Sequence, residues 1–196
     1  MKPDRTYSWL ENGEQVNPAE RFLLQTLVSR PSLFVRNGVA YAAIRRWRSS
    51  VKEYQIDALQ AIKCSPSPDF VKTICDDFEQ TLTQILGGNA YRYVVPVPCS
   101  RSGPECLSRQ VARSLAARLQ LPKRRALDIA PARGASHPKA NLRRPPMRLR
   151  EELCEPVLLV DDVATSGRHI EEAVKLLRQT CPVVLAVAWI GGAAER

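Results

Sequence analysis

The chain has 196 residues, of which 44% are hydrophobic and 25% charged, as is usual for a folded soluble domain. Its longest uninterrupted apolar run, residues 183–190, is far too short to span a membrane. The first residues also lack the apolar segment of a signal peptide. We therefore expect a cytoplasmic protein with no membrane contact.

The formal charge of +9 is concentrated in one part of the chain. Residues 101–150 hold 13 lysines and arginines against Glu105 and Asp128, so this segment carries +11 and the rest −2. Such clustering indicates a polyanionic partner, although a solvated basic surface would have the same composition. Pyrophosphate, a sugar phosphate and nucleic acid would each satisfy the charge.

The six cysteines are widely spread, and no two of them form a C-x-x-C pair. With only two histidines in the chain, a zinc site is poorly supported. Free, buried thiols in a reducing compartment are the simplest interpretation.

The N-terminal part of the chain contains several helix signals. Asn17 is a candidate N-cap, Pro18 suits the first helical position, and Glu20 would close a capping box. This helix is predicted to run to about residue 29, before Pro31. Residues 39–62 are predicted to be largely helical, and a further helix is expected from residue 67 to the glycines at 87–88.

From residue 93 onward short apolar strands alternate with amphipathic helices. The predicted elements are a strand at 93–98, a helix at 105–119, a weak strand at 125–129, a long loop at 131–150, a strand at 156–160, a helix at 168–179 and a strand at 182–190. This alternation predicts a Rossmann-like, parallel α/β sheet with flanking helices over residues 91–196. The mainly helical residues 1–90 would form an N-terminal hood or extension.

Two adjacent carboxylates, Asp161 and Asp162, follow the apolar run 157–160. We expect the strand to present both of them in solvent at its carboxyl end, where ligands of parallel sheets collect. Like charges this close repel each other and need a partner. A vicinal ribose diol would serve, and so would a divalent cation that bridges substrate oxygens.

Small residues and hydroxyls come next, at the start of the predicted helix. Thr165 and Ser166 offer hydroxyls, Gly167 permits close backbone approach, and the helix N-terminus offers free amides to an anion. Carboxylates for sugar hydroxyls beside amides for a phosphate indicate a sugar phosphate ligand. The simpler alternative is that the aspartates cap the helix after an ordinary turn.

Two other nucleotide-binding motifs are missing from the sequence. No G-x-x-x-x-G-K-[ST] occurs, so a Walker-A site is excluded. No G-x-G-x-x-G follows a predicted strand, so dinucleotide binding is unsupported.

The run VLLVDDVATSG at 157–167 resembles the signature of type I phosphoribosyltransferases, which use phosphoribosyl pyrophosphate (PRPP) and Mg²⁺. The resemblance extends more loosely over residues 93–192. The combination of VPVP at 95–98 with DDVATSG most resembles the ComF-like branch of that family.

The resemblance implies roles for individual residues. Asp161 and Asp162 would bind the ribose 2′- and 3′-hydroxyls as catalytic-site residues. Mg²⁺ would be held through PRPP, with these two carboxylates as the candidate protein ligands. The 5′-phosphate would be bound by Ala164, Thr165, Ser166, Gly167 and Arg168. The pyrophosphate would be bound by the turn Ser100, Arg101, Ser102 and Gly103, although an ordinary strand-to-helix turn has similar residues.

The basic loop at 131–150 falls where the family has a flexible catalytic loop. Candidates to close over the pyrophosphate are Arg133, His137, Lys139, Arg143 and Arg144, with Lys139 assigned to the catalytic set. A solvated basic loop is the alternative for any one of them.

The resemblance implies transfer of the ribose 5-phosphate of PRPP to a nitrogenous acceptor, with Mg²⁺-assisted release of pyrophosphate. No acceptor is identified. Tyr41, Trp47 and Trp189 could stack on a base, but each suits a packing role as well. The alternative function is a non-catalytic PRPP-sensing or nucleic-acid-binding module, with the segment 101–150 as its basic surface. We expect a homodimer in either case.

Overall fold

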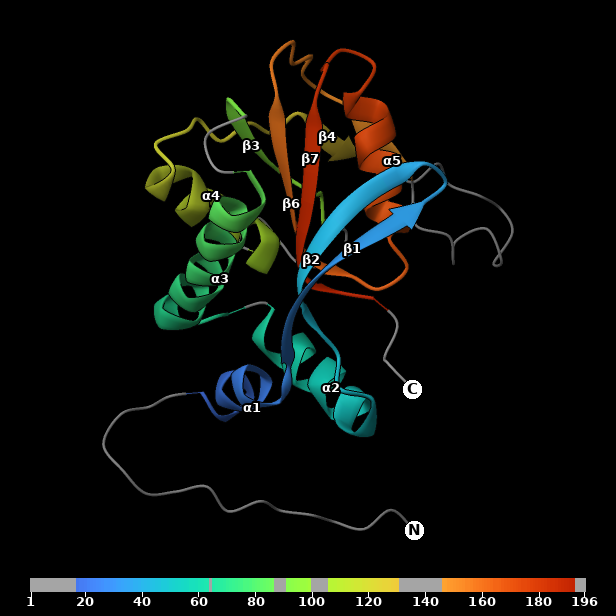
Figure 1. Cartoon of the computed structure of the whole chain (residues 1–196). Helices are drawn as coiled ribbons and strands as arrows, with labels where there is room; N and C mark the ends of the chain where they lie inside the picture. The colour runs from blue at the N-terminus through green and yellow to red at the C-terminus, as the bar shows by residue number, and fades with distance from the viewer. Residues whose placement is uncertain (1–16, 64, 87–90, 100–105, 131–145, 193–196) are drawn as a thin grey trace, which may run out of the picture.

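A five-stranded sheet forms the centre of the computed structural model, which describes residues 17–63, 65–86, 91–99, 106–130 and 146–192 (Figure 1). The spatial order is β1-β2-β7-β6-β3. The strands are β1 (Val28–Arg36), β2 (Val39–Arg46), β3 (Tyr93–Pro96), β6 (Val157–Ala164) and β7 (Val184–Gly191). All neighbours are parallel except β1 and β2. The predicted, mostly parallel α/β sheet is confirmed.

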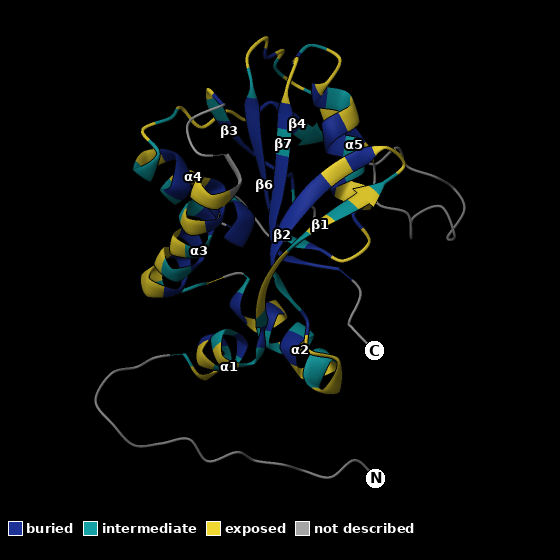
Figure 2. Cartoon of the chain, viewed as in Figure 1, coloured by how far each residue is buried: buried dark blue, intermediate teal, exposed yellow. Residues whose placement is uncertain are grey.

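Helices cover both faces of this sheet, and the alternation of side chains along the strands explains why. Leu158 of β6 packs in a core with α3 (Pro68–Leu86) and α4 (Leu107–Arg118). The next residue, Leu159, packs on the opposite face with α5 (Arg168–Leu177). Because both faces are covered, β6 and β7 are buried along most of their length (Figure 2).

A second, two-stranded sheet lies on the α5 side, where β4 (Leu127–Ile129) pairs antiparallel with β5 (Met147–Leu149). The prediction that residues 131–150 form one long loop is therefore wrong at its C-terminal end. The weak strand predicted near 125–129 exists, but its partner is β5 and not the main sheet.

A helical pair lies beyond the carboxyl ends of the parallel strands, in the lower part of Figure 1. It consists of α1 (Pro18–Thr26) and α2 (Lys52–Ile62), with the 3₁₀ turn η1 (Ser49–Val51) leading from β2 into α2. The pair therefore lies at the edge of the sheet where ligands of such folds bind. No helix in the described part of the chain is long and apolar enough to cross a membrane.

The prediction that residues 39–62 are largely helical is wrong for 39–46, which form β2. Asn37 and Gly38 both have positive φ, 47° and 77°, and they form the two-residue turn of the β1–β2 hairpin. Asn-Gly is a strong signal for such a turn. Pairing with β1 on one side and β7 on the other then outweighs local helical preference. The main sheet consequently begins well before residue 91.

The start of α1 follows its prediction only in part. Asn17 Oδ1 accepts from the Ala19 N–H at 3.0 Å, so the N-cap is confirmed. The Glu20 carboxylate does not close a capping box but accepts from the Ser67 N–H at 2.7 Å and the Ser67 hydroxyl at 2.6 Å. The helix ends at Thr26, because β1 begins at Val28.

Candidate functional site

The acid pair lies inside a strand. Asp161 and Asp162 belong to β6, which continues to Ala164 because it pairs with β7 as far as Gly191. The two residues are only 6% and 8% exposed. The expectation that both carboxylates lie in solvent after the strand is therefore wrong. The pair is buried within β6, near the carboxyl end of that strand.

Burial shapes the electrostatics of this pair. Burial, and then the neighbouring Asp162 carboxylate, raise the pKa of Asp161 well above its ordinary value. The Asp162 N–H donates to Asp161 Oδ1 at 2.9 Å, which holds the Asp161 carboxylate against the backbone of the next residue. Asp161 therefore holds a proton more readily than an exposed, isolated carboxylate would.

Lys63 supplies the partner that two adjacent carboxylates need. Its Nζ lies 3.0 Å from Asp162 Oδ2. Burial lowers the pKa of Lys63, but the carboxylates of Asp162 and Asp161 outweigh burial, so the net pKa is raised. Sequence reasoning missed Lys63, and no local pattern marks it, since it follows α2 almost a hundred residues before the acid pair.

The turn after β6 has the geometry of an anion site. Thr165, Ser166 and Arg168 are exposed, whereas Gly167 is buried and forms the N-cap of α5 with φ +68°. Among the described residues, no side chain caps this helix. The predicted binding of a phosphate by the amides of its first turn stays a prediction.

A side chain from the hairpin explains why residue 167 is glycine. A Cβ at this position would lie 2.8 Å from Tyr41 Cε1 and 2.8 Å from Tyr41 Oη. Tyr41 comes from β2 and stacks on Phe34 of β1, with the ring centroids 5.3 Å apart. The β1–β2 hairpin thus packs directly against the turn after β6 through the Tyr41 ring.

The hairpin also neutralises an acid in the first turn of α5. Glu171 accepts from Lys175 Nζ at 2.7 Å, from Asn37 Nδ2 at 2.9 Å and from Arg36 Nε at 2.7 Å. These hydrogen bonds lower the pKa of Glu171 to about 2. The charge of this carboxylate, which would repel an anion at the helix N-terminus, is therefore balanced by Arg36 and Lys175.

Several predicted site residues lie outside the described part of the chain. They are the pyrophosphate-turn residues Ser100, Arg101, Ser102 and Gly103 and the loop residues Arg133, His137, Lys139, Arg143 and Arg144. Cys99, the residue before that turn, is described and partly exposed.

The aromatic residues considered for base stacking are packing residues. Tyr41 is 5% exposed, Trp47 2% and Trp189 fully buried. Trp189 Nε1 donates to Asp77 Oδ2 at 2.8 Å, and Arg45 pairs with the same carboxylate at 2.6 Å. This network joins α3 to β2 and β7. Because all three rings are buried, none of them offers an exposed face to a ligand.

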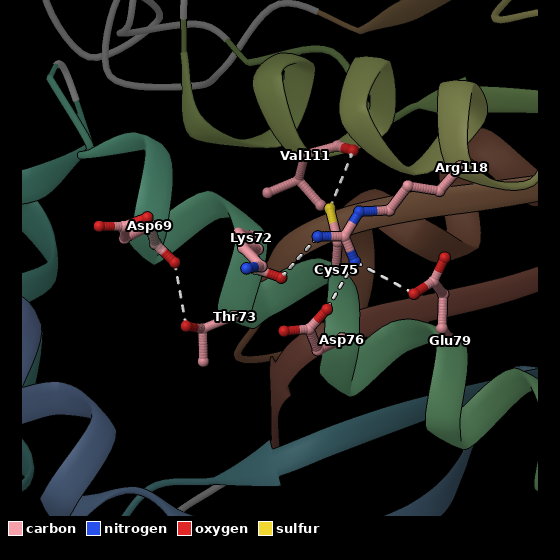
Figure 3. Close-up of polar contacts among 8 residues, drawn as sticks. All are labelled: Asp69, Lys72, Thr73, Cys75, Asp76, Glu79, Val111 and Arg118. Atoms are coloured by element: carbon pink, nitrogen blue, oxygen red, sulfur yellow. Dashed lines mark hydrogen bonds and ion pairs between the residues drawn. The ribbon is translucent and has the colours of Figure 1, made fainter.

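Much of the described basic charge is paired within the fold. Arg118 Nη1 donates to Asp76 Oδ1 at 2.7 Å and to Glu79 Oε2 at 3.1 Å, which joins α4 to α3 (Figure 3). Arg124 pairs with an acid too, as do Arg125 and Arg148. These pairs reduce the basic surface that residues 106–130 and 146–150 offer to nucleic acid.

The donor set at this edge fits Mg²⁺ only together with a substrate. The described residues contain no group of three or more His, Cys, Asp or Glu side chains arranged to hold a metal ion. Mg²⁺ typically binds one or two carboxylates plus substrate phosphates. Asp161 and Asp162 are of the right chemistry for that arrangement.

The comparisons with known proteins agree with this geometry at the level of the fold. No protein-family model matches the chain, and no curated protein matches it. Among solved structures, an adenine phosphoribosyltransferase is 14% identical over 89% of both chains, with a TM-score of 0.50. The chain therefore has the type I phosphoribosyltransferase fold.

Two further solved structures match with lower TM-scores. Adenine phosphoribosyltransferase from Saccharomyces cerevisiae, complexed with an imino-altritol bisphosphate and adenine, is 15% identical, with 91% of this chain and 90% of that chain covered and a TM-score of 0.47. Orotate phosphoribosyltransferase from Aeropyrum pernix is 18% identical, with 88% and 80% covered and a TM-score of 0.43. The similarity to the ComF-like branch stays a prediction.

Proposed function

We propose that the chain is a phosphoribosyltransferase that transfers the ribose 5-phosphate of PRPP to a nitrogenous acceptor. One arrangement carries the proposal: the buried pair Asp161 and Asp162 directly precedes the exposed turn at Thr165 and Ser166 and the uncapped N-terminus of α5. Sugar hydroxyls and a phosphate are the groups that these two features recognise.

The 5′-phosphate is bound by the first-turn amides of α5, with the hydroxyls of Thr165 and Ser166 and the guanidinium of Arg168 around it. The ribose hydroxyls are bound by Asp161 and Asp162. The turn Ser100–Gly103 and the loop residue Lys139, with Arg133, His137 and Arg143, bind the pyrophosphate.

In the transfer, the bond between the anomeric carbon and the pyrophosphate oxygen breaks, and a bond from the acceptor nitrogen to that carbon forms. Positive charge develops on the sugar ring, as in glycoside hydrolysis. The protein acts chiefly by orientation and electrostatics. Asp161 and Asp162 would hold Mg²⁺ together with the donor, and the ion would supply positive charge to the leaving group. The helical pair α1 and α2 borders the acceptor.

Release of pyrophosphate from PRPP tests this function directly. The protein is incubated with PRPP, Mg²⁺ and a panel of purine and pyrimidine bases. At least one base should give turnover, and Asp161→Asn/Asp162→Asn should reduce it by about 100-fold or more, given what one lost transition-state contact typically costs. Asp57→Asn, at an exposed position of α2, is the control that keeps activity.

PRPP binding without turnover of any base would overturn the enzyme assignment in favour of a non-catalytic PRPP-sensing module. Nucleic-acid binding that weakens steeply with salt, in the absence of turnover, would favour a nucleic-acid-binding module instead.

A further inference from the structure

The fold fixes the backbone of Lys63 close to the acid pair. Lys63 is the C-cap of α2, and its N–H donates to the Leu59 carbonyl at 3.0 Å. Leu59 and Ile62 are 3% and 0% exposed and belong to the large core on the α3 and α4 side of the sheet. The end of α2 is therefore anchored by apolar packing, without help from the lysine side chain.

The side chain of Lys63 reaches from this anchored position to the carboxylates. Its Nζ contacts Asp162 Oδ2 at 3.0 Å, and its side chain is 27% exposed while that of Asp162 is 11% exposed. An ammonium has three donors and a carboxylate has two oxygens. The contact thus holds one oxygen of the Asp162 carboxylate and fixes the orientation of that group.

The Lys63 contact is not the only polar contact that holds α2 in place. Gln55 joins this helix to α1 and to the segment after β2: its Oε1 accepts from the Arg48 N–H at 3.0 Å, and its Nε2 donates to Thr26 Oγ1 at 3.0 Å. The lysine is instead directed at the Asp161–Asp162 pair near the carboxyl end of β6. Removing the ammonium would take away the cation that the described residues place against this pair, at a buried position where charge is costly.

We propose that Lys63 is a positioning residue for sugar recognition, which orients the Asp162 carboxylate toward the ribose diol of the donor. This inference rests on the proposed function, since it assumes that the acid pair binds ribose. It makes α2 part of the donor site as well as a border of the acceptor site.

The test compares two ligands that differ only in one hydroxyl of the diol, ribose 5-phosphate and 2-deoxyribose 5-phosphate. Their dissociation constants are measured by calorimetry for the wild type, Lys63→Met and Lys63→Arg. The wild type should prefer ribose 5-phosphate by about tenfold, as expected for one hydrogen bond to a charged group. Lys63→Met should reduce this preference to about one, and Lys63→Arg should retain part of it.

A double-mutant cycle then checks that Lys63 acts through Asp162. Lys63→Met should cause no further loss of preference in an Asp162→Asn background, because the group that it positions is already changed. Lys52→Met, at the other end of α2, is the matched control and should keep the wild-type preference.

The outcomes separate the two levels of the proposal. A wild type that does not prefer ribose over deoxyribose overturns the proposed function, and with it the role of Lys63. A wild type that discriminates while Lys63→Met discriminates equally well overturns the role of Lys63 alone. Equal weakening of both ligands in Lys63→Met, with a lowered melting temperature, means a structural role and also overturns it.

Discussion

Gly167 combines two constraints that no other residue type satisfies. Its φ of +68° lies in the left-handed region, and its Cα faces the ring of Tyr41. Gly38, in the hairpin turn, has a φ of +77° but no atom within 4 Å of where a Cβ would lie. An alanine at Gly38 would therefore suffer backbone strain alone, whereas an alanine at Gly167 would suffer both strain and steric overlap.

We predict that Gly167→Ala destabilises the fold by about 3 kcal/mol, because strain and overlap with Tyr41 add. Gly38→Ala should cost only about 1 kcal/mol, from strain alone. Urea unfolding of both variants measures the difference. Equal losses in the free energy of unfolding would mean that the Tyr41 ring moves aside without cost, and that the hairpin is not packed rigidly against residue 167.

At the scale of elements, α3 is joined to the sheet through Asp77. This carboxylate accepts from Arg45 Nε and Nη2 at 2.6 and 2.8 Å and from Trp189 Nε1 at 2.8 Å. The neighbouring Asp76 pairs with Arg118 of α4, but 58% of its side chain is exposed. Both aspartates thus bind an arginine, one in a shielded position and the other in solvent.

Asp77→Ala should lower the free energy of unfolding by about 3 kcal/mol, since Arg45 and Trp189 lose a shared partner in a shielded position. Asp76→Ala should lower it by less than about 1 kcal/mol, because exposed ion pairs contribute little. Denaturant titrations on the two variants make the comparison. Similar losses would contradict the assignment of Asp77 as the main link between α3 and the sheet.

The contact between the hairpin and α5 should depend on pH through Glu171. Its pKa falls from an ordinary 4.5 to about 2 in the folded state, so its contribution to stability is complete above pH 4.5 and is lost as the pH falls toward 2. The difference in stability between the wild type and Glu171→Gln should therefore shrink over that window. Glu53→Gln, at an exposed site on α2, is the control. A difference that does not change between pH 5 and pH 2 would contradict this linkage.

At the scale of the whole molecule, the second half of the chain was the more predictable. The strands and helices after residue 93 carry periodic apolar patterns, and the run at 157–167 marks the turn and the acid pair. Those patterns are local, so a sequence can show them. The parallel pairing of β3, β6 and β7 agrees with the predicted parallel sheet.

The features that escaped prediction depend on long-range pairing. Residues 39–46 form a strand because β7 lies beside them, although Asn37-Gly38 was a usable signal for the hairpin. The extension of β6 to Ala164, which buries the acid pair, depends on the length of β7. Lys63 reaches that pair only because α2 packs at the carboxyl edge of the sheet. None of these placements is encoded in a local motif.

The central claim is that the acid pair and the turn after it bind the donor PRPP. Calorimetric titration of PRPP with Mg²⁺ into the wild type and into Asp161→Asn/Asp162→Asn tests it most directly. We predict saturable binding by the wild type and a loss of affinity of at least about 100-fold in the double variant, from two lost hydrogen bonds to charged groups. Wild-type protein that does not bind PRPP, or a double variant that binds it equally well, would contradict the account.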